Sequence, residues 1–337
     1  MDPIEFGARQ AVVNCVKVQK GERVVMITDR ETERMADAIL VHAKAAGASV
    51  QKFVMEDFGP RSVDGKSPLP FPKDINDAMS RAQASFLVAG IRPGEYQSFR
   101  QPMINAVEKH MLRHAHMVGF TEVMMHQGMA VDYAEVQELS RKVRDIVSKA
   151  HEIKVFTPAG TDLTVSPGSK SEWLCCDGNI RPGMITNLPG GEVYVVPSDA
   201  NGKVVIDGCL GDSFRQYGKL QASPITYELK GGRCVRGSVR CSLKRLQKEF
   251  AKYTFETDAN SNRVGEFAIG TNLGVKELIG NMLQDEKFPS VHIAMGDPAD
   301  TRKVNWRSKV HLDGLMLNPT IVLDGRTTIM KDGKFVI

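Results

Sequence analysis

The sequence lacks several features that would place it in a specialised class of protein. No apolar run approaches the roughly 20 residues that a membrane-spanning helix needs, so we expect no membrane span. The N-terminal residues MDPIEFGARQ carry acidic side chains early and no basic-then-apolar order, so the sequence predicts no secretory signal. The net charge is only +4, from 44 basic and 40 acidic residues, and its dispersed pattern argues against a nucleic-acid partner.

Two common motifs are also missing. The six cysteines contain no CxxC pair, and the adjacent Cys175 and Cys176 are poorly placed to bond to each other, so we expect reduced thiols in a cytoplasmic protein. No GxGxxG follows the first expected strand, which argues against a dinucleotide site. The chain has 337 residues, 42% apolar and 25% charged, which is typical of a globular protein with two domains.

The first 150 residues alternate between expected strands and expected helices. Apolar runs bounded by turns predict strands at 21–29, 48–57, 85–91 and 116–121, and apolar residues at helical spacing predict helices at 30–48, 75–84, 101–115 and 132–150. Such alternation predicts an α/β domain over residues 1–150, with an open, mostly parallel sheet and helices on both faces.

The pattern changes near His151. Residues 151–337 contain short β-branched segments separated by Gly, Pro and Asn, and the sequences SDANGK, ELKGGR, LDGR and KDGK predict tight hairpin turns. Two stretches, 242–253 and 274–287, interrupt this pattern with helical character. We therefore expect a β-rich α+β domain over 151–337, which would carry the catalytic site.

Five possible metal ligands lie in short segments of this second half. They are Glu192 in NLPGGEVYVVP, Glu266 in NRVGEFAIGTN, His292 in SVHIAMGD, and His311 with Asp313 in KVHLDG. Carboxylates mixed with neutral imidazoles suit a divalent ion such as zinc, manganese or cobalt. Five ligands exceed the four of a closed tetrahedral site, which favours two ions that share a bridging carboxylate and activate water.

Each of these residues also has a structural alternative. Glu192 alone is also compatible with a solvated carboxylate that opens a strand, and Glu266 with an ion pair to Arg263. His292 alone is more typical of a hydrogen-bonded core histidine. His311 and Asp313 are different, because residues i and i+2 of a strand point to the same face, about 6–7 Å apart along the backbone. They can meet one ion, or the aspartate can orient the imidazole.

Other residues offer weaker hypotheses. His110, His114 and His116, with His126 nearby, are more compatible with surface or interface imidazoles near a helix C-terminus than with a metal site. Arg92 follows a strand and could grip a substrate carboxylate, although a solvated loop arginine is the simpler interpretation. The aromatic and basic residues near the expected ligands could line a pocket: Trp173, Trp306 and Arg307.

The order of these segments resembles that of the M29 metallopeptidases, the aminopeptidase T family. The likeness extends over nearly the whole chain and is strongest between about residues 131 and 325, through NLPGGEVYVVP, NRVGEFAIGTN, HIAMGD and HLDGLM. The resemblance implies an α/β N-terminal domain, a β-rich catalytic domain, two divalent metals (Zn, Co, Mn or Mg) and a homodimer around an enclosed cavity.

The resemblance also assigns roles. It implies that Glu192, Glu266, His292, His311 and Asp313 are the metal ligands, and that one of the two glutamates, with Glu192 preferred, is also the general base. The implied reaction is removal of an N-terminal residue from a peptide or a related small amide. The chain departs from the family in having no tyrosine in GDPADTRKVN after HIAMG, in reading KVNWRSKVH before the histidine, and in its short length. These departures leave the substrate open.

A second family is similar in fold and ends in the same HLD motif. The 2,5-dihydroxypyridine 5,6-dioxygenases hold one Fe(II) with two histidines and one carboxylate. They resemble this chain less at three positions, because they carry a histidine in place of Glu266 and lack the acid of GGEVY and the histidine of HIAMG. The alternative function is therefore a ring-cleaving dioxygenase with one Fe(II). A third hypothesis, a non-enzymatic scaffold, predicts a chain that binds no stoichiometric metal.

Overall fold

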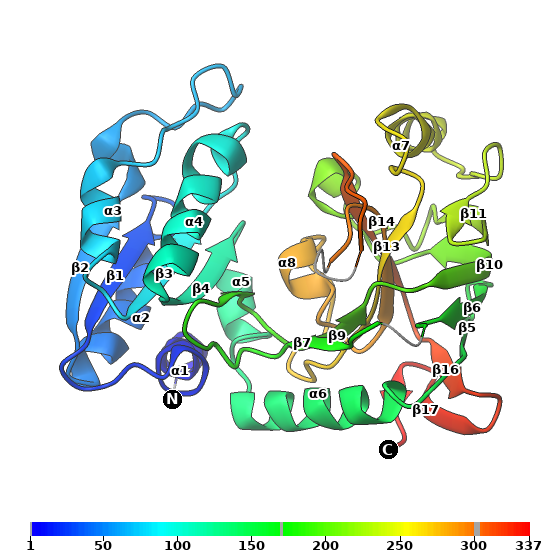
Figure 1. The fold of residues 1–337 in the computed structure, drawn as a ribbon, viewed down its shortest axis with the longest axis horizontal. Coiled ribbons are helices and arrows are strands. Elements are labelled where there is room, and N and C mark those ends of the chain that lie inside the picture. Colours follow the sequence, from blue (N-terminus) through cyan, green and yellow to red (C-terminus); the bar gives the residue numbers. More distant parts are fainter. Residues whose placement is uncertain (1, 169–170, 300–303) are drawn as a thin grey trace. The chain divides into compact units, whose positions relative to one another are not determined.

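The computed structural model describes residues 2–168, 171–299 and 304–337 (Figure 1). The chain forms two compact units, the first made of Met1–Gln137 and Cys176–Gly190, the second of Glu138–Cys175 and Gly191–Ile337. Residues 138–150 thus pack with the second unit, and residues 176–190 return to the first. The predicted domain limits, 1–150 and 151–337, remain a prediction, since compact units need not be independently folding domains.

The first unit is built on a parallel sheet with strand order β2-β1-β3-β4-β8, in which every registered pair is parallel. Its strands are β1 (Arg23–Thr28), β2 (Ser49–Val54), β3 (Ala84–Ala89), β4 (Arg113–Val118) and β8 (Ile185–Asn187). Its helices are α1 (Pro3–Gln10), α2 (Glu33–Ala45), α3 (Lys73–Met79), α4 (Gln101–His110) and α5 (Glu122–His126). The expected parallel α/β sheet is confirmed.

Strand alternation explains why both faces of this sheet are covered. Val25 and Leu87 point to the face on which α3 and α4 lie together, and they share a core with Met79 and Met103 from those helices (Figure 1). Val24 and the other alternate residues point to the opposite face and are also buried. Helix α2 contacts β1 and β2, and it ends just before Gly47, whose φ of 87° suits glycine.

The second unit contains two sheets whose registered pairs are antiparallel. The larger has the order β12-β11-β10-β6-β5-β16-β17-β18, and the smaller, which we call the ligand sheet, has the order β15-β14-β13-β9-β7. The strands of the larger sheet are β5 (Ile153–Phe156), β6 (Asp162–Ser166), β10 (Asp199–Ile206), β11 (Ile225–Lys230), β12 (Arg233–Cys234), β16 (Thr320–Leu323), β17 (Thr327–Lys331) and β18 (Lys334–Phe335). Those of the ligand sheet are β7 (Leu174–Cys176), β9 (Glu192–Val195), β13 (Val264–Gly270), β14 (Val291–Gly296) and β15 (His311–Met316).

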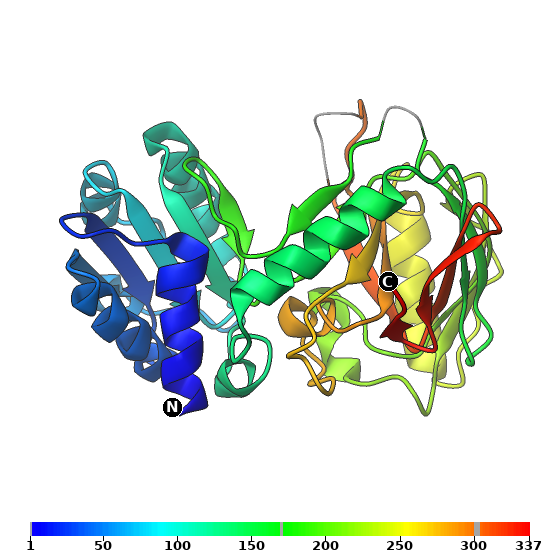
Figure 2. The same cartoon turned by 90° about the horizontal axis from the view of Figure 1, so that it is seen from below.

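One apolar core joins the two sheets of the second unit. Val155 and Leu163 of the larger sheet share this core with Phe267 and Ile293 of the ligand sheet. Helix α7 (Lys244–Glu256), yellow in Figures 1 and 2, adds Phe250, which stacks on Tyr227 with ring centroids 5.6 Å apart. The chain enters this unit through α6 (Tyr133–Val147), and a short helix, α8 (Met282–Asp285), follows β13. The β-rich character predicted for this half is confirmed.

Two local predictions were wrong. The segment SDANGK does not form a turn but lies in strand β10 and its approach, where Asp199–Lys203 pair with β6 and Gly202–Ile206 with β11. Backbone hydrogen bonds to partners on both sides outweigh the turn preference of Asn and Gly. The helix expected over 274–287 shrinks to the four residues of α8, and Gly280, with φ 73°, interrupts it. The other three hairpin turns are confirmed by strand pairing.

Among the residues that the structure describes, no helix is long and apolar enough to cross a bilayer.

Candidate metal centre

All five predicted ligands come from four neighbouring strands of the ligand sheet and lie on one of its faces. Glu266 pairs with Ala294 of β14, and Ala294 pairs on its other side with Asp313 of β15. Directly opposed residues of antiparallel strands point to the same face, and so do residues two apart along a strand. His292 and His311, in β14 and β15, therefore share this face, and the pairing of Glu192 with Gly270 places the β9 carboxylate there too.

Small residues occupy the positions between the ligands on this face. His292 pairs with Ala268, His311 with Gly296, Glu192 with Gly270, and Glu266 and Asp313 both with Ala294. Side chains of one or no carbon leave space above the sheet where the longer carboxylates and imidazoles can converge. The opposite face carries apolar residues of the core, among them Val193, Phe267, Ile293 and Leu312.

A β-bulge sets the direction of Glu266. Val264 pairs with Met295 and Glu266 with Ala294, so Gly265 is an extra residue with no partner of its own. Val264 and Met295 belong to the core, whereas Glu266 points to the ligand face. A Cβ at Gly265 would lie 2.5 Å from the carbonyl oxygen of Gly296, so only glycine fits this bulge.

Glu266 lies between two groups of possible ligands. Its Oε1 atom is 3.4 Å from Nε2 of His292, and its Oε2 atom is 3.5 Å from Nε2 of His311. Nε2 of His311 is also 3.3 Å from Oδ1 of Asp313. Ligand atoms of Glu192, Glu266 and His292 lie within 4.8 Å of one another, and so do those of Glu266, His311 and Asp313. The carboxylate of Glu266 thus belongs to both triads, with one oxygen toward each histidine.

Glu192 shows how well a cation fits here. Its side chain is 8% exposed, and its Oε1 atom accepts a hydrogen bond of 2.5 Å from Nζ of the fully buried Lys287. Its Oε2 atom lies 3.5 Å from Nε2 of His292 but has no hydrogen-bond partner among the described residues. A buried carboxylate oxygen without a partner costs free energy, and a bound metal ion would remove that cost. The donor set therefore fits the divalent metal that the sequence predicts.

The second ring nitrogen of a metal-bound histidine usually donates a hydrogen bond that orients the ring. Nδ1 of His311 lies 2.8 Å from the carbonyl oxygen of Asp297, which fixes Nε2 toward Glu266 and Asp313. Nδ1 of His292 is buried and has no partner among the described residues. Arg263, the alternative partner considered for Glu266, instead lies over the ring of Trp306, 4.3 Å from its centroid.

Two residues beside the five predicted ligands, Glu286 and Lys287, were not predicted from the sequence. They follow α8, and Nζ of Lys287 contacts carboxylate oxygens of both Glu286 and Glu192. A third group of possible ligands consists of Glu286, His292 and Asp313, again within 4.8 Å. The available signal was the charged run of residues 285–287 just before the strand that carries His292, but a helical pattern made these residues look solvated.

Burial and charge oppose each other in the pKa values of these groups. Burial lowers the pKa of His292, but the carboxylates of Glu266, Glu192 and Asp313 raise it to about 9. The pKa of His311 is raised in the same way by Asp313 and Glu266. Burial would raise the pKa of Asp313, but the two histidines and Lys287 lower it to about 2. Burial is the main cause that raises the pKa of Glu286 to about 8. The carboxylates thus stabilise positive charge on both histidines, so the site favours cations.

Two of the four clustered histidines in the first unit differ from their prediction, whereas His110 is half-buried at the end of α4 and His126 is exposed. His114 and His116 are buried in β4 rather than surface groups, with Nδ1 of His114 2.8 Å from Oγ of Ser85 and Nε2 3.2 Å from Nδ1 of His116. Their alternating apolar neighbours make them part of a central strand. Arg92 pairs with Glu31 at 3.1 Å. Residues 300–303, in the segment without tyrosine, lie outside the described residues.

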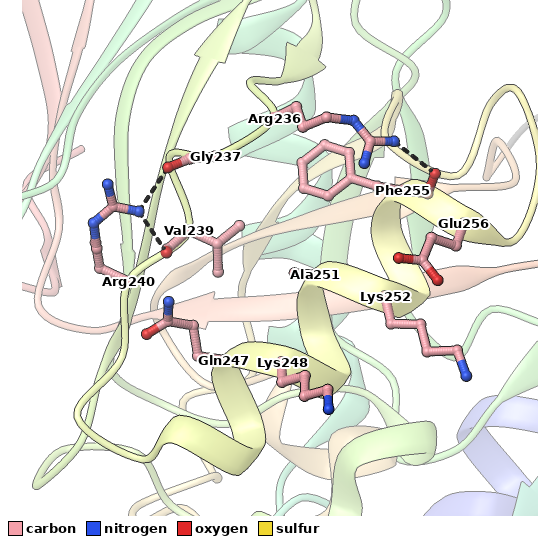
Figure 3. A pocket seen from close by; sticks show the side chains of 10 residues that line it. All are labelled: Arg236, Gly237, Val239, Arg240, Gln247, Lys248, Ala251, Lys252, Phe255 and Glu256. Atoms are coloured by element: carbon pink, nitrogen blue, oxygen red, sulfur yellow. Dashed lines mark hydrogen bonds between the residues drawn. The ribbon is translucent and has the colours of Figure 1, made fainter.

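A separate hollow of about 510 Å³ lies beside α7 (Figure 3). Its walls carry Arg236, Arg240, Lys248 and Lys252, and the guanidinium of Arg236 lies 4.9 Å from the ring centroid of Phe255. None of the five predicted ligands lines it. Its lining is mostly basic, with one carboxylate from Glu256, so it is distinct from the candidate metal centre.

The comparison with protein families gives one match. The model of the thermophilic metalloprotease family (M29) matches residues 115–335, about two thirds of the chain, including all five predicted ligands. The chain belongs to this family. M29 enzymes are metallopeptidases that use divalent metals, and this membership supports a metal-dependent, aminopeptidase-like hydrolase. The family resemblance seen in the sequence is therefore confirmed.

Solved structures of two kinds share the fold of this M29 chain. Wild-type AmpT from Thermus thermophilus has 18% sequence identity and a TM-score of 0.70, with 99% of both chains covered. The 2,5-dihydroxypyridine dioxygenase from Pseudomonas putida KT2440 has 16% identity and a TM-score of 0.72, with 98% of this chain and 96% of that chain covered. No curated protein matches in a sequence search. At these identities the likeness shows the fold alone, and the side chains of the site must indicate the chemistry.

Proposed function

We propose that this chain is a dinuclear metal-dependent aminopeptidase that removes an N-terminal residue from a peptide or a related small amide. The observation that carries the proposal is the position of Glu266, with one carboxylate oxygen near His292 and the other near His311. A carboxylate shared by two triads suits a pair of ions a few ångströms apart. In this proposal Glu192, Glu266 and His292 hold one ion, and Glu266, His311 and Asp313 the other.

Each part of the chain would have a separate task. Divalent ions in such a site supply an activated water and polarise the scissile carbonyl. Lys287 fixes Oε1 of Glu192, so that only Oε2 faces the site, and Asp297 orients His311. We assign proton transfer from the attacking water to one of two glutamates, Glu192 or Glu266. Glu192 is preferred because both carboxylate oxygens of Glu266 already face a histidine.

A second candidate function follows from the same side chains. The site contains His292 and His311 with Asp313 close to each of them, and two histidines with one carboxylate can also hold one Fe(II) in an oxygenase. The ring-cleaving dioxygenase therefore stays the alternative. Glu192 and Glu266 argue against it, because an iron site of that kind would leave at least one of these buried acids without a cation.

One experiment separates these functions. Protein purified without oxygen is analysed for metals, then assayed on aminoacyl anilides and, with an oxygen electrode, on 2,5-dihydroxypyridine. Two zinc, manganese, cobalt or magnesium ions per chain with anilide cleavage are expected. One iron per chain with oxygen uptake overturns the proposal in favour of the dioxygenase, and a chain without stoichiometric metal is a scaffold. A homodimer is part of the proposal and is checked by light scattering after gel filtration.

A further inference from the structure

Among the described residues that form the groups of possible ligands, Glu286 is the one that the family-based ligand set leaves without a role. It directly follows α8, and its side chain is 13% exposed. A ligand oxygen of Glu286 lies within 4.8 Å of ligand atoms of both His292 and Asp313. His292 belongs to the first proposed triad and Asp313 to the second, so Glu286, like Glu266, lies close to both metal positions.

We propose that Glu286 is a sixth metal-binding residue of this centre. The inference rests on the proposed dinuclear function and extends its ligand set. Two oxygen or nitrogen ligands on opposite sides of an ion, each at about 2.0–2.2 Å, are roughly 4 Å apart, so atoms within 4.8 Å need only small shifts to share one ion. The unpartnered Oε2 atom of Glu192 independently shows that this buried centre is built to receive a cation.

The backbone around Glu286 is held firmly, as a metal ligand requires. The carboxylate of Asp285, the last residue of α8, accepts hydrogen bonds from the backbone N–H groups of Ile279 (2.9 Å) and Gly280 (2.7 Å). These bonds tie the segment before α8 to the end of the helix. The carbonyl oxygen of Lys287 accepts a hydrogen bond of 3.0 Å from the backbone N–H of Asn272. Both chain neighbours of Glu286 are therefore fixed, and its carboxylate needs little reorganisation to bind.

Pairing with Lys287 does not fully account for Glu286. The single ammonium of Lys287 contacts two carboxylates, Glu286 and Glu192, and two more, Glu266 and Asp313, share the centre. Lys287 and the two histidines offer at most three cationic groups to four buried acids, and a buried carboxylate without compensation is costly. A bound divalent ion would supply the missing compensation, and Glu286 lies where it can contribute directly.

The test compares two substitutions that differ in charge and reach. Glu286→Gln removes the charge, whereas Glu286→Asp keeps it and withdraws the carboxylate by one methylene. Zinc affinity is measured by competition with a chromophoric chelator. The coordination number of cobalt in the cobalt-substituted protein is followed by its visible absorption. If Glu286 binds metal, both variants lose at least about tenfold in affinity for one ion, and the cobalt absorption changes as the coordination number falls. Glu249→Gln changes a carboxylate on α7, outside the groups of possible ligands, and should match wild type.

Three outcomes decide the inference. If Glu286→Asp keeps wild-type affinity and an unchanged cobalt spectrum, Glu286 acts only through its charge and the inference is wrong. Wild-type zinc affinity in both variants overturns it as well. Thermal unfolding of the metal-free proteins identifies a variant that fails to fold, and the other variant then carries the test. If both variants lose affinity while the wild type cleaves no anilide, the ligand assignment stands and the proposed reaction fails.

Discussion

Nζ of Lys287 lies 2.5 Å from Oε1 of Glu192, and both side chains are buried beside the candidate metal centre. Replacing Lys287 by methionine would leave the acids at this end of the site without their internal cation. Because removing one partner of a buried ion pair costs about 3–5 kcal/mol, the metal-free Lys287→Met protein should unfold at a clearly lower denaturant concentration than wild type.

Bound metal should reduce that loss, since divalent ions compensate the same carboxylates. Urea unfolding in the presence of a chelator and of excess zinc measures both states. Lys252→Met, which changes an exposed lysine on α7, is the control and should stay within about 0.5 kcal/mol of wild type. An equal loss with and without zinc would mean that Lys287 has a packing role unrelated to the site charge.

The second prediction concerns turnover. Glu192→Gln keeps an oxygen that can accept the hydrogen bond from Lys287, so the fold should be retained, but it removes the charge that the proposed mechanism uses. We expect anilide cleavage to fall by roughly 100-fold or more. Steady-state assays and thermal unfolding measure the two effects, with Glu228→Gln on β11 as the exposed control. Wild-type turnover in Glu192→Gln would exclude the assigned role of this residue.

The third prediction tests the small residues between the ligands. Ala294 lies in register between Glu266 and Asp313, and a leucine there would fill the space in which their carboxylates converge. Ala294→Leu should lose most of its bound metal, with a stability change of about 1–3 kcal/mol from overpacking. Elemental analysis and thermal unfolding measure these quantities, and the exposed Ala222→Leu is the control. Full metal content in Ala294→Leu would show that the ions do not bind on this face.

The fourth prediction concerns acid sensitivity of the first unit. Burial lowers the pKa of His114 to about 3, from an ordinary value near 6.5. Between these values the unfolded chain binds a proton that the folded chain does not, so stability should fall as the pH drops below about 6.5. His114→Gln should reduce this loss by roughly 1.4 kcal/mol per pH unit between pH 6 and pH 5.

Urea titrations at pH 7.5, 6 and 5 measure the difference between variant and wild type. His151→Gln is the matched control, because the His151 side chain is 95% exposed and should leave the slope unchanged. An identical slope in His114→Gln and wild type would show that another group causes the acid loss.

Regular strand periodicity explains what could be predicted from the sequence. The alternation of residues in KVHLDG predicted that His311 and Asp313 share one face. In the structure Nε2 of His311 lies 3.3 Å from Oδ1 of Asp313. Apolar runs also gave the strands that carry Glu192, Glu266 and His292. Short-range patterns were sufficient to place these side chains because each predicted ligand lies within a strand whose own residues determine its two faces.

Features that depend on distant residues could not be predicted. Nothing near Lys287 in the sequence indicates that it is fully buried, because its partner Glu192 lies 95 positions away along the chain. SDANGK has the composition of a turn, and only the strands on its two sides make it extended. The bulge at Gly265 also depends on the register of β14, so the orientation of Glu266 relative to Val264 was not readable from local alternation.

That bulge decides which side chains of the strand face each side of the sheet. Deleting Gly265 would leave every residue type of the strand in place but would shift which of them lie inward and outward upstream of Glu266. Either Glu266 would be driven among hydrocarbon side chains or Val264 would be forced out among charged groups. A single glycine without a side chain therefore keeps the charged groups on one face of the sheet separate from the apolar groups on the other.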